Sequence, residues 1–563
     1  MLDYEVIVIG AGVAGIYQIK RLVDLGIEAT VLEAAGGLGG TWYSNRYPGA
    51  RFDSESYTYG YSFSRELLDE WHWKERFSGQ PENLRYLDHV ADKFDLRRHM
   101  QFNCRVDAAH WDEAGNFWRL TVSDGRTLTA RFVIMTLGLL SIPARPRYPG
   151  MERFKGQSFH TFDWPHEGVP LDGKKVAVIG TGATAIQAIP VIAEKAAELT
   201  VFQRRPNWAA PLNNGPISDE EMADIRRRYD EIFATCARTP GGFEHEPDRR
   251  GFWEVSREER LKLWDRLYDE PGFGIWLRNF REIFTDEKAN AEFSEYIAGR
   301  IRRRVRDPAT AEKLIPRDHG FGVQRVPLET RYYEAFNRDN VQLVDVSATP
   351  IERVTETGLR TADGRDREFD VIVYATGFDA ITGAYDHIDI RGTGGERLAE
   401  LWKDGPSTFL GLMIAGFPNL LMPTGPQSGS ASVNFPRGIE MGVNWCTDLL
   451  IHMREHGQAR CEPTLAAQAR WSKHVQDMYA MLLLRKAKGW FTGYNSNVPG
   501  HEEGHIRYVV YNGGQPKYTA ILGQVAMSGY EGIMFDKPAS PEAVGARQST
   551  GAHARSRAGA ERA

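Results

Sequence analysis

The sequence predicts an α/β protein with two dinucleotide-binding, Rossmann-like domains and a helical insertion in the second domain. Two observations suggest the domains: glycine-rich turns follow short apolar runs at two places, and a second apolar run with a polar end comes after each turn. A third observation is length. The chain has 563 residues, which is too long for a single hydrophobic core.

The first glycine-rich turn follows a β-branched run at the start of the chain, which is typical of a buried parallel strand. Gly10, Gly12 and Gly15 permit a tight turn, a close approach of the backbone to a pyrophosphate, and close packing of helix on strand. The next apolar run ends at Glu33, whose carboxylate suits a ribose 2′-hydroxyl. This site therefore favours FAD or NAD.

The second turn contains Gly180, Gly182 and the small residue Ala185, but its following strand ends differently. Arg204 and Arg205 stand where the acid would be, and guanidinium groups bind a 2′-phosphate that a carboxylate would repel. This site favours NADP, although a solvated strand end is the alternative interpretation of the two arginines. The other turn residues expected to contact this cofactor are Thr181, Ala183 and Thr184.

Between the two turns lies a third motif, made of Phe154, Gly156, His160, Trp164 and Pro165. A further stretch contains Gly40, Trp42, Tyr47, Pro48, Gly49 and Asp53. Both patterns resemble those of the Baeyer–Villiger monooxygenases, class B flavin monooxygenases, of the type that acts on cyclic and bulky ketones. The resemblance extends from about residue 4 to about residue 535, with the motifs in the family's order.

The resemblance implies FAD in the first site and NADPH in the second. It also implies a reaction in which molecular oxygen is inserted next to a ketone carbonyl, giving an ester or lactone through a C4a-peroxyflavin and a tetrahedral adduct. Three alternatives remain open: oxidation of sulfur or nitrogen, an uncoupled NADPH oxidase, and a redox sensor without catalysis. The Trp164-Pro165 ending disfavours the first alternative, and the presence of both Arg325 and Asp53 disfavours the third.

The resemblance also assigns roles to single residues. Arg325 is expected to be the catalytic cation that stabilises the negatively charged peroxide, and Asp53 the carboxylate that orients it. Gln324 stands where relatives commonly carry a lysine for the NADP 2′-phosphate, so one charge is missing. Trp490 is expected in a mobile lid over NADP, and His160 at a domain junction rather than in proton transfer. The residues expected near FAD are Gly40, Thr41, Trp42 and Tyr59.

The motif order predicts a chain that passes twice through each domain. FAD-binding segments are expected over residues 1–142 and 375–536, and NADP-binding segments over 150–212 and 325–374. Between the NADP-binding segments, residues 213–324 have helical character, and the basic run from Arg302 to Arg306 is interpreted as the solvated face of a helix. The stretch 270–277 resembles an insertion of relatives that accept bulky ketones. The tail, 537–563, is expected to be disordered.

Composition agrees with a cytoplasmic enzyme that acts on a small molecule. A net charge of −6 gives no basic footprint for nucleic acid or an anionic membrane. No long apolar run suggests a membrane helix, and the four widely spaced cysteines suggest neither a disulfide framework nor a metal site. A ketone and oxygen are the expected small-molecule partners, and the oligomeric state stays open.

Overall fold

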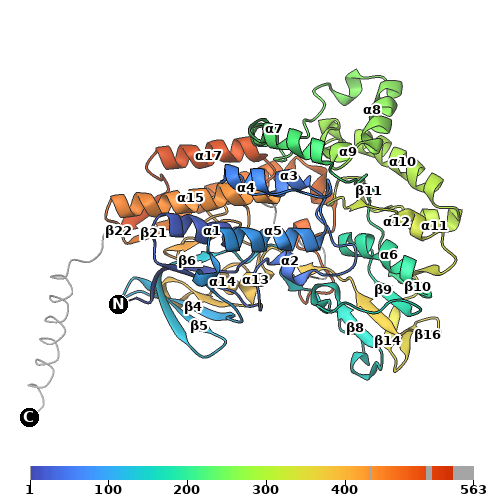
Figure 1. Cartoon of the computed structure of the whole chain (residues 1–563), viewed down its shortest axis with the longest axis horizontal. Coiled ribbons are helices and arrows are strands. Elements are labelled where there is room, and N and C mark those ends of the chain that lie inside the picture. The colour runs from blue at the N-terminus through green and yellow to red at the C-terminus, as the bar shows by residue number, and fades with distance from the viewer. Residues whose placement is uncertain (1, 430–432, 502–509, 537–563) are drawn as a thin grey trace, which may run out of the picture.

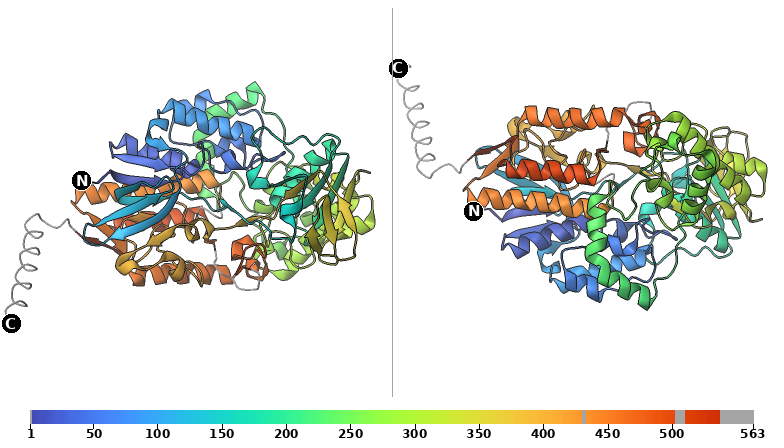
Figure 2. Two further views of the ribbon diagram at one scale, coloured as in Figure 1. Left: turned by 90° about the horizontal axis from the view of Figure 1, so that it is seen from below. Right: turned by 90° about the horizontal axis from the view of Figure 1, so that it is seen from above.

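The structure, a computed structural model, describes residues 2–429, 433–501 and 510–536. The views show two halves (Figures 1 and 2): one is blue and orange to red, from the two ends of the chain, and the other is green to yellow, from its middle. The tail 537–563 lies outside the described residues. Each half is built around a sheet that contains parallel strands, which confirms the predicted fold class.

The first half contains an eight-stranded sheet in the order β19-β4-β5-β6-β1-β2-β3, with β20 paired to β6. Its centre is parallel, because β1 (Tyr4–Ile9) pairs with both β2 (Ala29–Leu32) and β6 (Thr127–Met135) in that sense. The other strands are β3 (Met100–Gln101), β4 (Val106–Asp112), β5 (Phe117–Val122), β19 (Asp389–Arg391) and β20 (Leu420–Leu421). The last two strands join this sheet from the far end of the sequence.

Helices from both ends of the chain pack together in this half (Figure 1). α1 (Val13–Asp24) lies against α15 (Phe435–Glu455), where the Tyr17 hydroxyl donates to Asn444 Oδ1 at 2.7 Å and Gln18 Nε2 donates to Thr447 Oγ1 at 3.0 Å. Further helices are α5 (Gln80–Lys93), α16 (Leu465–Ala480) and α17 (Gln515–Met527). The chain ends are therefore joined through buried polar contacts as well as through the sheet.

The second half contains a five-stranded sheet in the order β13-β10-β9-β17-β8, and all four strand pairs are parallel. Its strands are β8 (Gln157–His160), β9 (Lys175–Ile179), β10 (Glu198–Gln203), β13 (Val341–Asp345) and β17 (Val371–Tyr374). The helix α6 (Ala183–Lys195) connects β9 to β10. A small antiparallel sheet follows β13, made of β14 (Ile351–Val354), β15 (Gly358–Thr361) and β16 (Asp366–Glu368).

A helical segment interrupts the chain between β10 and β13. It comprises α7 (Asp219–Arg238), α8 (Arg257–Asp269), α9 (Gly274–Leu277), α10 (Glu287–Arg304), α11 (Pro308–Lys313) and α12 (Tyr332–Ala335). Ser218 caps α7 by accepting from the Glu221 N–H at 3.1 Å. The fully buried Trp264 and Phe293 belong to the same hydrophobic core as Val176 of β9, so this segment and the five-stranded sheet share one core.

Among the described residues, no helix has both the length and the apolar character needed to cross a membrane. The exact domain boundaries stay a prediction.

Candidate active site

The first glycine-rich turn connects β1 to α1 and has the shape that a dinucleotide requires. Gly10 adopts φ +105°, and a Cβ atom on Gly15 would lie 1.8 Å from the Gly10 carbonyl oxygen, so the helix packs directly on the turn. Gly12 precedes α1 and has no side chain to cap it, which leaves the first N–H groups of the helix available to an anion. The turn therefore fits the pyrophosphate of a bound cofactor.

Glu33 lies at the end of β2, close to this turn. Its carboxylate accepts hydrogen bonds from the Ala11 N–H at 2.6 Å and the Ala35 N–H at 2.8 Å. Burial raises the pKa of Glu33 above its ordinary value, although the two N–H groups oppose that shift. The side chain is thus fixed beside the turn, in the place that suits a ribose hydroxyl.

The aromatic residues expected near FAD lie together beside the same turn. Gly40 meets the turn closely, because a Cβ atom on it would lie 2.9 Å from the Gly12 Cα. Thr41 and Trp42 follow it in the short helix α2 (Thr41–Ser44). The Trp42 indole N–H donates to the Tyr59 hydroxyl at 2.5 Å, and both side chains are buried. The structure thus brings the residues predicted near FAD together beside the first turn.

The second glycine-rich turn opens into a cavity of about 340 Å³. Residues of the turn, of the end of β10 and of a segment near the C-terminus line it, among them Gly180, Thr181, Gly182, Ala183, Thr184, Arg204, Arg205, Gln324, Arg325 and Trp490. No described atom lies within 4 Å of a Cβ placed on Gly182, so the turn faces open space there. The cavity and the uncapped N-terminus of α6 fit a second dinucleotide.

The two arginines of this cavity are held by residues that sequence reasoning missed. The Arg205 guanidinium lies 3.7 Å from Asp318 Oδ2 and stacks 4.8 Å over the Tyr494 ring. Arg204 donates to the Ser496 hydroxyl. Burial lowers the pKa of Arg204 from its ordinary value, and the Arg205 charge adds to this effect. Tyr494 and Ser496 carry no motif, so only their closeness in sequence to Trp490 pointed toward them.

Gln324 contacts the segment that contains Trp490, and both residues line the cavity. The Gln324 amide donates to the Lys488 carbonyl at 3.2 Å, and Trp490 follows two residues later in a 3₁₀ turn, Trp490–Thr492. The Trp490 ring packs against Phe491 at a centroid distance of 4.2 Å. The segment that contains Trp490 therefore closes one side of the cavity.

Asp53 and Arg325 form an ion pair despite their separation in sequence. Arg325 Nη1 lies 2.5 Å from Asp53 Oδ2, and the Asp53 side chain is only 1% exposed, whereas that of Arg325 is 27% exposed. Asp53 Oδ2 also accepts from the Leu328 N–H at 3.2 Å. Beneath the guanidinium lies Phe273, with its ring centre 5.6 Å away. One charged group thus reaches the cavity while its partner is fixed behind it.

The motif that contains His160 lies where β8 and β17 end. His160 Nε2 lies 3.1 Å from the Gly377 carbonyl, while Nδ1 accepts from the Phe162 N–H at 3.1 Å. Burial lowers the pKa of His160 to about 4. Trp164 is buried in the core of this half, and Gly156 lies so close to Asp370 that a Cβ would come within 2.5 Å of its carbonyl. Phe154 and Pro165 are partly buried.

These contacts place His160 beside the cavity wall instead of inside the cavity. Asn495, next to Tyr494, donates to the Phe378 carbonyl at 3.0 Å, one residue beyond the His160 contact. The motif therefore supports the segment against which the C-terminal wall docks. Among the described residues, no cluster of His, Cys, Asp or Glu is arranged to hold a metal ion.

Comparison with known proteins assigns the family. Residues 3–215 match the profile of flavin-binding monooxygenase-like proteins. The chain is 44% identical over 535 residues to the 2-oxo-Δ3-4,5,5-trimethylcyclopentenylacetyl-CoA monooxygenase of Pseudomonas putida, which covers 94% of this chain and 98% of the relative. It is 38% identical over 539 residues to a Baeyer–Villiger monooxygenase of Pseudooceanicola batsensis, covering 95% and 97% of the two chains.

Solved structures agree with these relatives. The crystal structure of OTEMO in complex with FAD and NADP superimposes with a TM-score of 0.91 at 43% identity, covering 95% of this chain and all of that one. Similarity of this extent over nearly the whole length defines the family and its cofactors. The chain belongs to the Baeyer–Villiger monooxygenases, flavoproteins that use FAD, NADPH and oxygen to convert ketones to esters or lactones.

Proposed function

We propose that Arg325 is the cation that stabilises oxygen transfer to the ketone, and that Asp53 holds it in place. The observation that carries this proposal is the 2.5 Å ion pair between a guanidinium that lines the cofactor cavity and a carboxylate that is 1% exposed. A buried carboxylate restricts the guanidinium, so that its charge is oriented before the reaction begins. Exposed surface pairs, whose side chains rotate freely, lack this preorganisation.

Bound FAD, reduced by NADPH, supplies the activated oxygen. This chain's residues then have three tasks. The Arg325 guanidinium faces the negative charge that develops on oxygen during transfer, and Phe273 beneath it excludes water and so strengthens that attraction. His160 holds no exchangeable charge near neutral pH, because its pKa is lowered to about 4. It therefore acts as a structural support for the cavity wall.

The substrate we propose is a bulky cyclic ketone. Phe273 belongs to the stretch 270–277, and its contact with Arg325 places this stretch beside the group that faces the reacting oxygen. The Pseudomonas putida relative is named for a substituted cyclopentenyl substrate, which is of the same class.

The proposed domain division, FAD-binding over 1–142 and 375–536 and NADP-binding over 150–212 and 325–374, is supported by the strands that each sheet contains. A cytoplasmic location is supported by four free, buried cysteines.

Replacing Arg325 by Ala tests the role of the cation. We expect FAD binding and flavin reduction by NADPH to persist, while ester formation falls by about 10²–10³-fold, the loss that follows removal of one oriented donor from a transition state. Hydrogen peroxide should replace the ester as the oxygen product. The assay follows NADPH oxidation, ester and peroxide together, across small, aryl and bulky cyclic ketones.

Arg331→Ala is the matched control, since Arg331 is 69% exposed and pairs with Glu194 on the surface. It should leave the ester yield unchanged. Undiminished ester formation by the Arg325→Ala variant would rule out the proposed role of this residue.

A further inference from the structure

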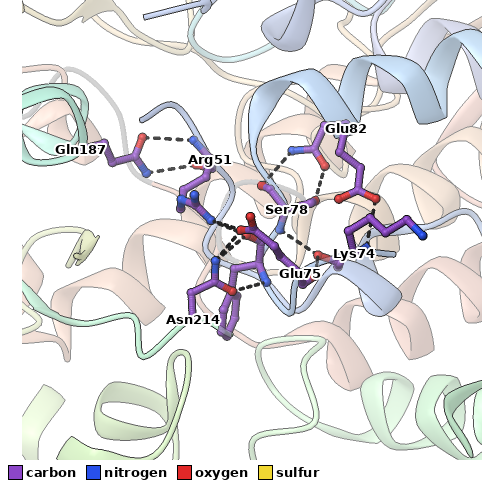
Figure 3. A network of polar contacts seen from close by, with 10 residues as sticks. Arg51, Lys74, Glu75, Ser78, Glu82, Gln187 and Asn214 are labelled. Carbon is purple, nitrogen blue, oxygen red and sulfur yellow. Dashed lines mark hydrogen bonds and ion pairs between the residues drawn. The ribbon is translucent and has the colours of Figure 1, made fainter. Parts of the chain in front are cut away.

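Gln187 joins the helix of the coenzyme site to the loop of residues 47–53, which ends at Asp53. The side-chain oxygen of Gln187, Oε1, accepts from the Tyr47 hydroxyl at 2.8 Å and from the Arg51 backbone N–H at 3.4 Å. Its amide donates to the Arg51 carbonyl at 3.0 Å and to Asp53 Oδ1 at 3.4 Å. Figure 3 shows Gln187 and Arg51 facing one another across this contact. Each polar atom of one side chain is therefore used to hold the loop.

The backbones of the loop and of α6 also approach each other closely. Gly49, at the tip of the loop, adopts φ +83°, and a Cβ atom on it would lie 2.4 Å from the backbone carbonyl oxygen of Gln187. Only a glycine permits this approach without a shift of the loop or of α6. A movement of the helix is consequently transmitted to the loop.

The other side of the loop is anchored elsewhere. Arg51 Nη1 lies 2.8 Å from Glu75 Oε2 and donates to the Phe77 carbonyl at 2.6 Å, while the Asn214 amide donates to the same Glu75 oxygen at 2.6 Å (Figure 3). The loop is thus held by polar contacts on both sides, to Glu75 and Phe77 on one side and to α6 on the other. A displacement of α6 is therefore expected to change the position of the loop relative to Glu75.

Asp53 divides its two oxygens between helix and arginine. Oδ1 faces the Gln187 amide, and Oδ2 binds Arg325 at 2.5 Å. Because the carboxylate is 1% exposed, water does not replace either partner readily. The orientation of Arg325 is therefore linked to the position of Gln187.

The N-terminus of α6 is the part of the helix that receives the coenzyme. Ala183 and Thr184 line the cavity, and Gln187 follows about one turn later along the helix. Occupancy at the first turn and the contact with Asp53 thus act on adjacent turns of one rigid element. The coenzyme site and the Asp53–Arg325 pair can therefore influence one another through α6, without a direct contact between them.

We propose that Gln187 is a positioning residue that couples occupancy of the coenzyme site to the orientation of Arg325 through Asp53. With NADP bound, α6 is held and Gln187 fixes Asp53 in the position that aims the guanidinium into the cavity. The inference rests on the role proposed for Arg325. It adds the reason why the cation is correctly placed when the coenzyme is present.

Gln187→Leu removes the four polar contacts and keeps a side chain of similar size. We expect flavin reduction by NADPH to change by no more than about twofold, while the ratio of ester to peroxide falls on the order of tenfold, as for residues within one network. Added NADP⁺ should raise that ratio in the unmodified enzyme and leave it unchanged in the variant. An unaltered ratio with an unaltered response to NADP⁺ would overturn the proposal.

Asn340→Ala is the matched control. Asn340 donates to the Ala193 and Ala196 carbonyls, at 3.0 and 2.8 Å, and so supports the opposite end of the same helix. Loosening α6 there should lower thermal stability and leave the ester ratio intact. A fall in the ratio equal to that of Gln187→Leu would show that general loosening of the helix is responsible, and would contradict a specific role for Gln187.

Gln187→Glu provides a test that does not depend on loss of structure. A protonated carboxyl group donates to Asp53 as the amide does, whereas an ionised one repels it, and the Asp53 charge raises the pKa of the introduced group. The ester ratio should therefore approach that of the unmodified enzyme at low pH and fall as pH rises. A pH profile parallel to that of the unmodified enzyme would argue against the contact.

Arg325→Ala, assayed alongside, separates the two proposals. If it still forms ester, the proposed role of Arg325 fails whatever the Gln187 variants do. If it loses ester formation while both Gln187 variants keep the ester ratio of the unmodified enzyme, the coupling alone is refuted.

Discussion

His160 is kept neutral by burial, and this has a consequence for stability. The side chain is 4% exposed, and its Nδ1 accepts a hydrogen bond, so the proton of the neutral ring is on Nε2, facing the Gly377 carbonyl. Its pKa is lowered to about 4 in the folded protein, whereas an unfolded chain titrates near its ordinary value of about 6.5. Between these values the unfolded state binds more protons, so stability falls as pH falls.

His160→Gln is expected to flatten this pH dependence, because glutamine retains an N–H donor and does not titrate. The contribution of His160 amounts to about 1.4 kcal/mol per pH unit within the window from about 6.5 down to about 4. Thermal unfolding of the FAD-bound protein across this window measures it. His166→Gln, at an exposed position, is the control and should keep the slope of the unmodified protein. Identical slopes for all three proteins would refute the assignment.

The two strand–turn–helix elements look alike in sequence, and glycines at different positions of their turns serve different purposes. Gly15 lies where a Cβ would meet the Gly10 carbonyl oxygen at 1.8 Å, within the protein itself. Gly182 has φ in the ordinary region, and its missing Cβ points into space that no described atom occupies within 4 Å. Gly15 therefore allows the helix to pack on the turn, whereas Gly182 leaves room for a ligand.

Alanine substitutions should separate these two uses. Gly15→Ala is expected to destabilise the protein by about 1–3 kcal/mol or more through overpacking, and to lower its FAD content. Gly182→Ala should leave thermal stability and FAD content unchanged and weaken NADPH binding, because the methyl group takes the place of the approaching pyrophosphate. FAD absorbance, melting temperature and the NADPH KM distinguish the outcomes. Loss of stability in Gly182→Ala would contradict this account.

Such turns could be predicted because their chemistry is local. Glycine spacing, the preceding apolar run and the polar end of the next strand all lie within a short stretch. In the structure Glu33 contacts the first turn and Arg205 lines the cavity at the second. The Asp53–Arg325 pairing was expected from family resemblance alone, since nothing local joins residues so far apart.

Contacts without a sequence motif could not be predicted. Gln187 is an ordinary residue of an apolar helix until the loop of residues 47–53 packs on it. The solvated helix face predicted for the basic run from Arg302 is wrong at Arg304, whose side chain is 20% exposed and pairs with Glu329 and Glu334, each at 2.6 Å. Tertiary packing decides which arginine of such a run forms ion pairs, and this cannot be predicted from the run of residues alone.

The coenzyme cavity is assembled from parts of the chain that lie far apart in sequence. The turn at 180–184, the strand end at 204–207, the segment 318–325 and the C-terminal segment 484–497 all contribute to its lining. Binding at this place joins the five-stranded sheet, the end of the helical segment and the C-terminal wall. Selectivity for the coenzyme is thus a property of the whole molecule, and each wall contributes charge or contact to it.

The segment 318–325 lacks a positive charge at position 324, where relatives commonly carry a lysine. No other wall of the cavity supplies a charge at that position. Gln324 donates to the Lys488 carbonyl, and Arg205 is already shared between Asp318 and the Tyr494 ring. Gln324→Lys is therefore expected to raise the preference for NADPH over NADH. One charged hydrogen bond to the 2′-phosphate contributes about 1.5–3 kcal/mol, which corresponds to roughly ten- to a hundredfold in the ratio of kcat/KM values.

Gln342→Lys introduces the same charge on β13 at an exposed position and should leave that ratio unchanged. Steady-state rates with both coenzymes, at one ionic strength, measure the effect. An unchanged ratio in Gln324→Lys would mean that the 2′-phosphate is held by Arg204 and Arg205 alone. The segment 318–325 would then contribute shape to the cavity without contributing to its selectivity.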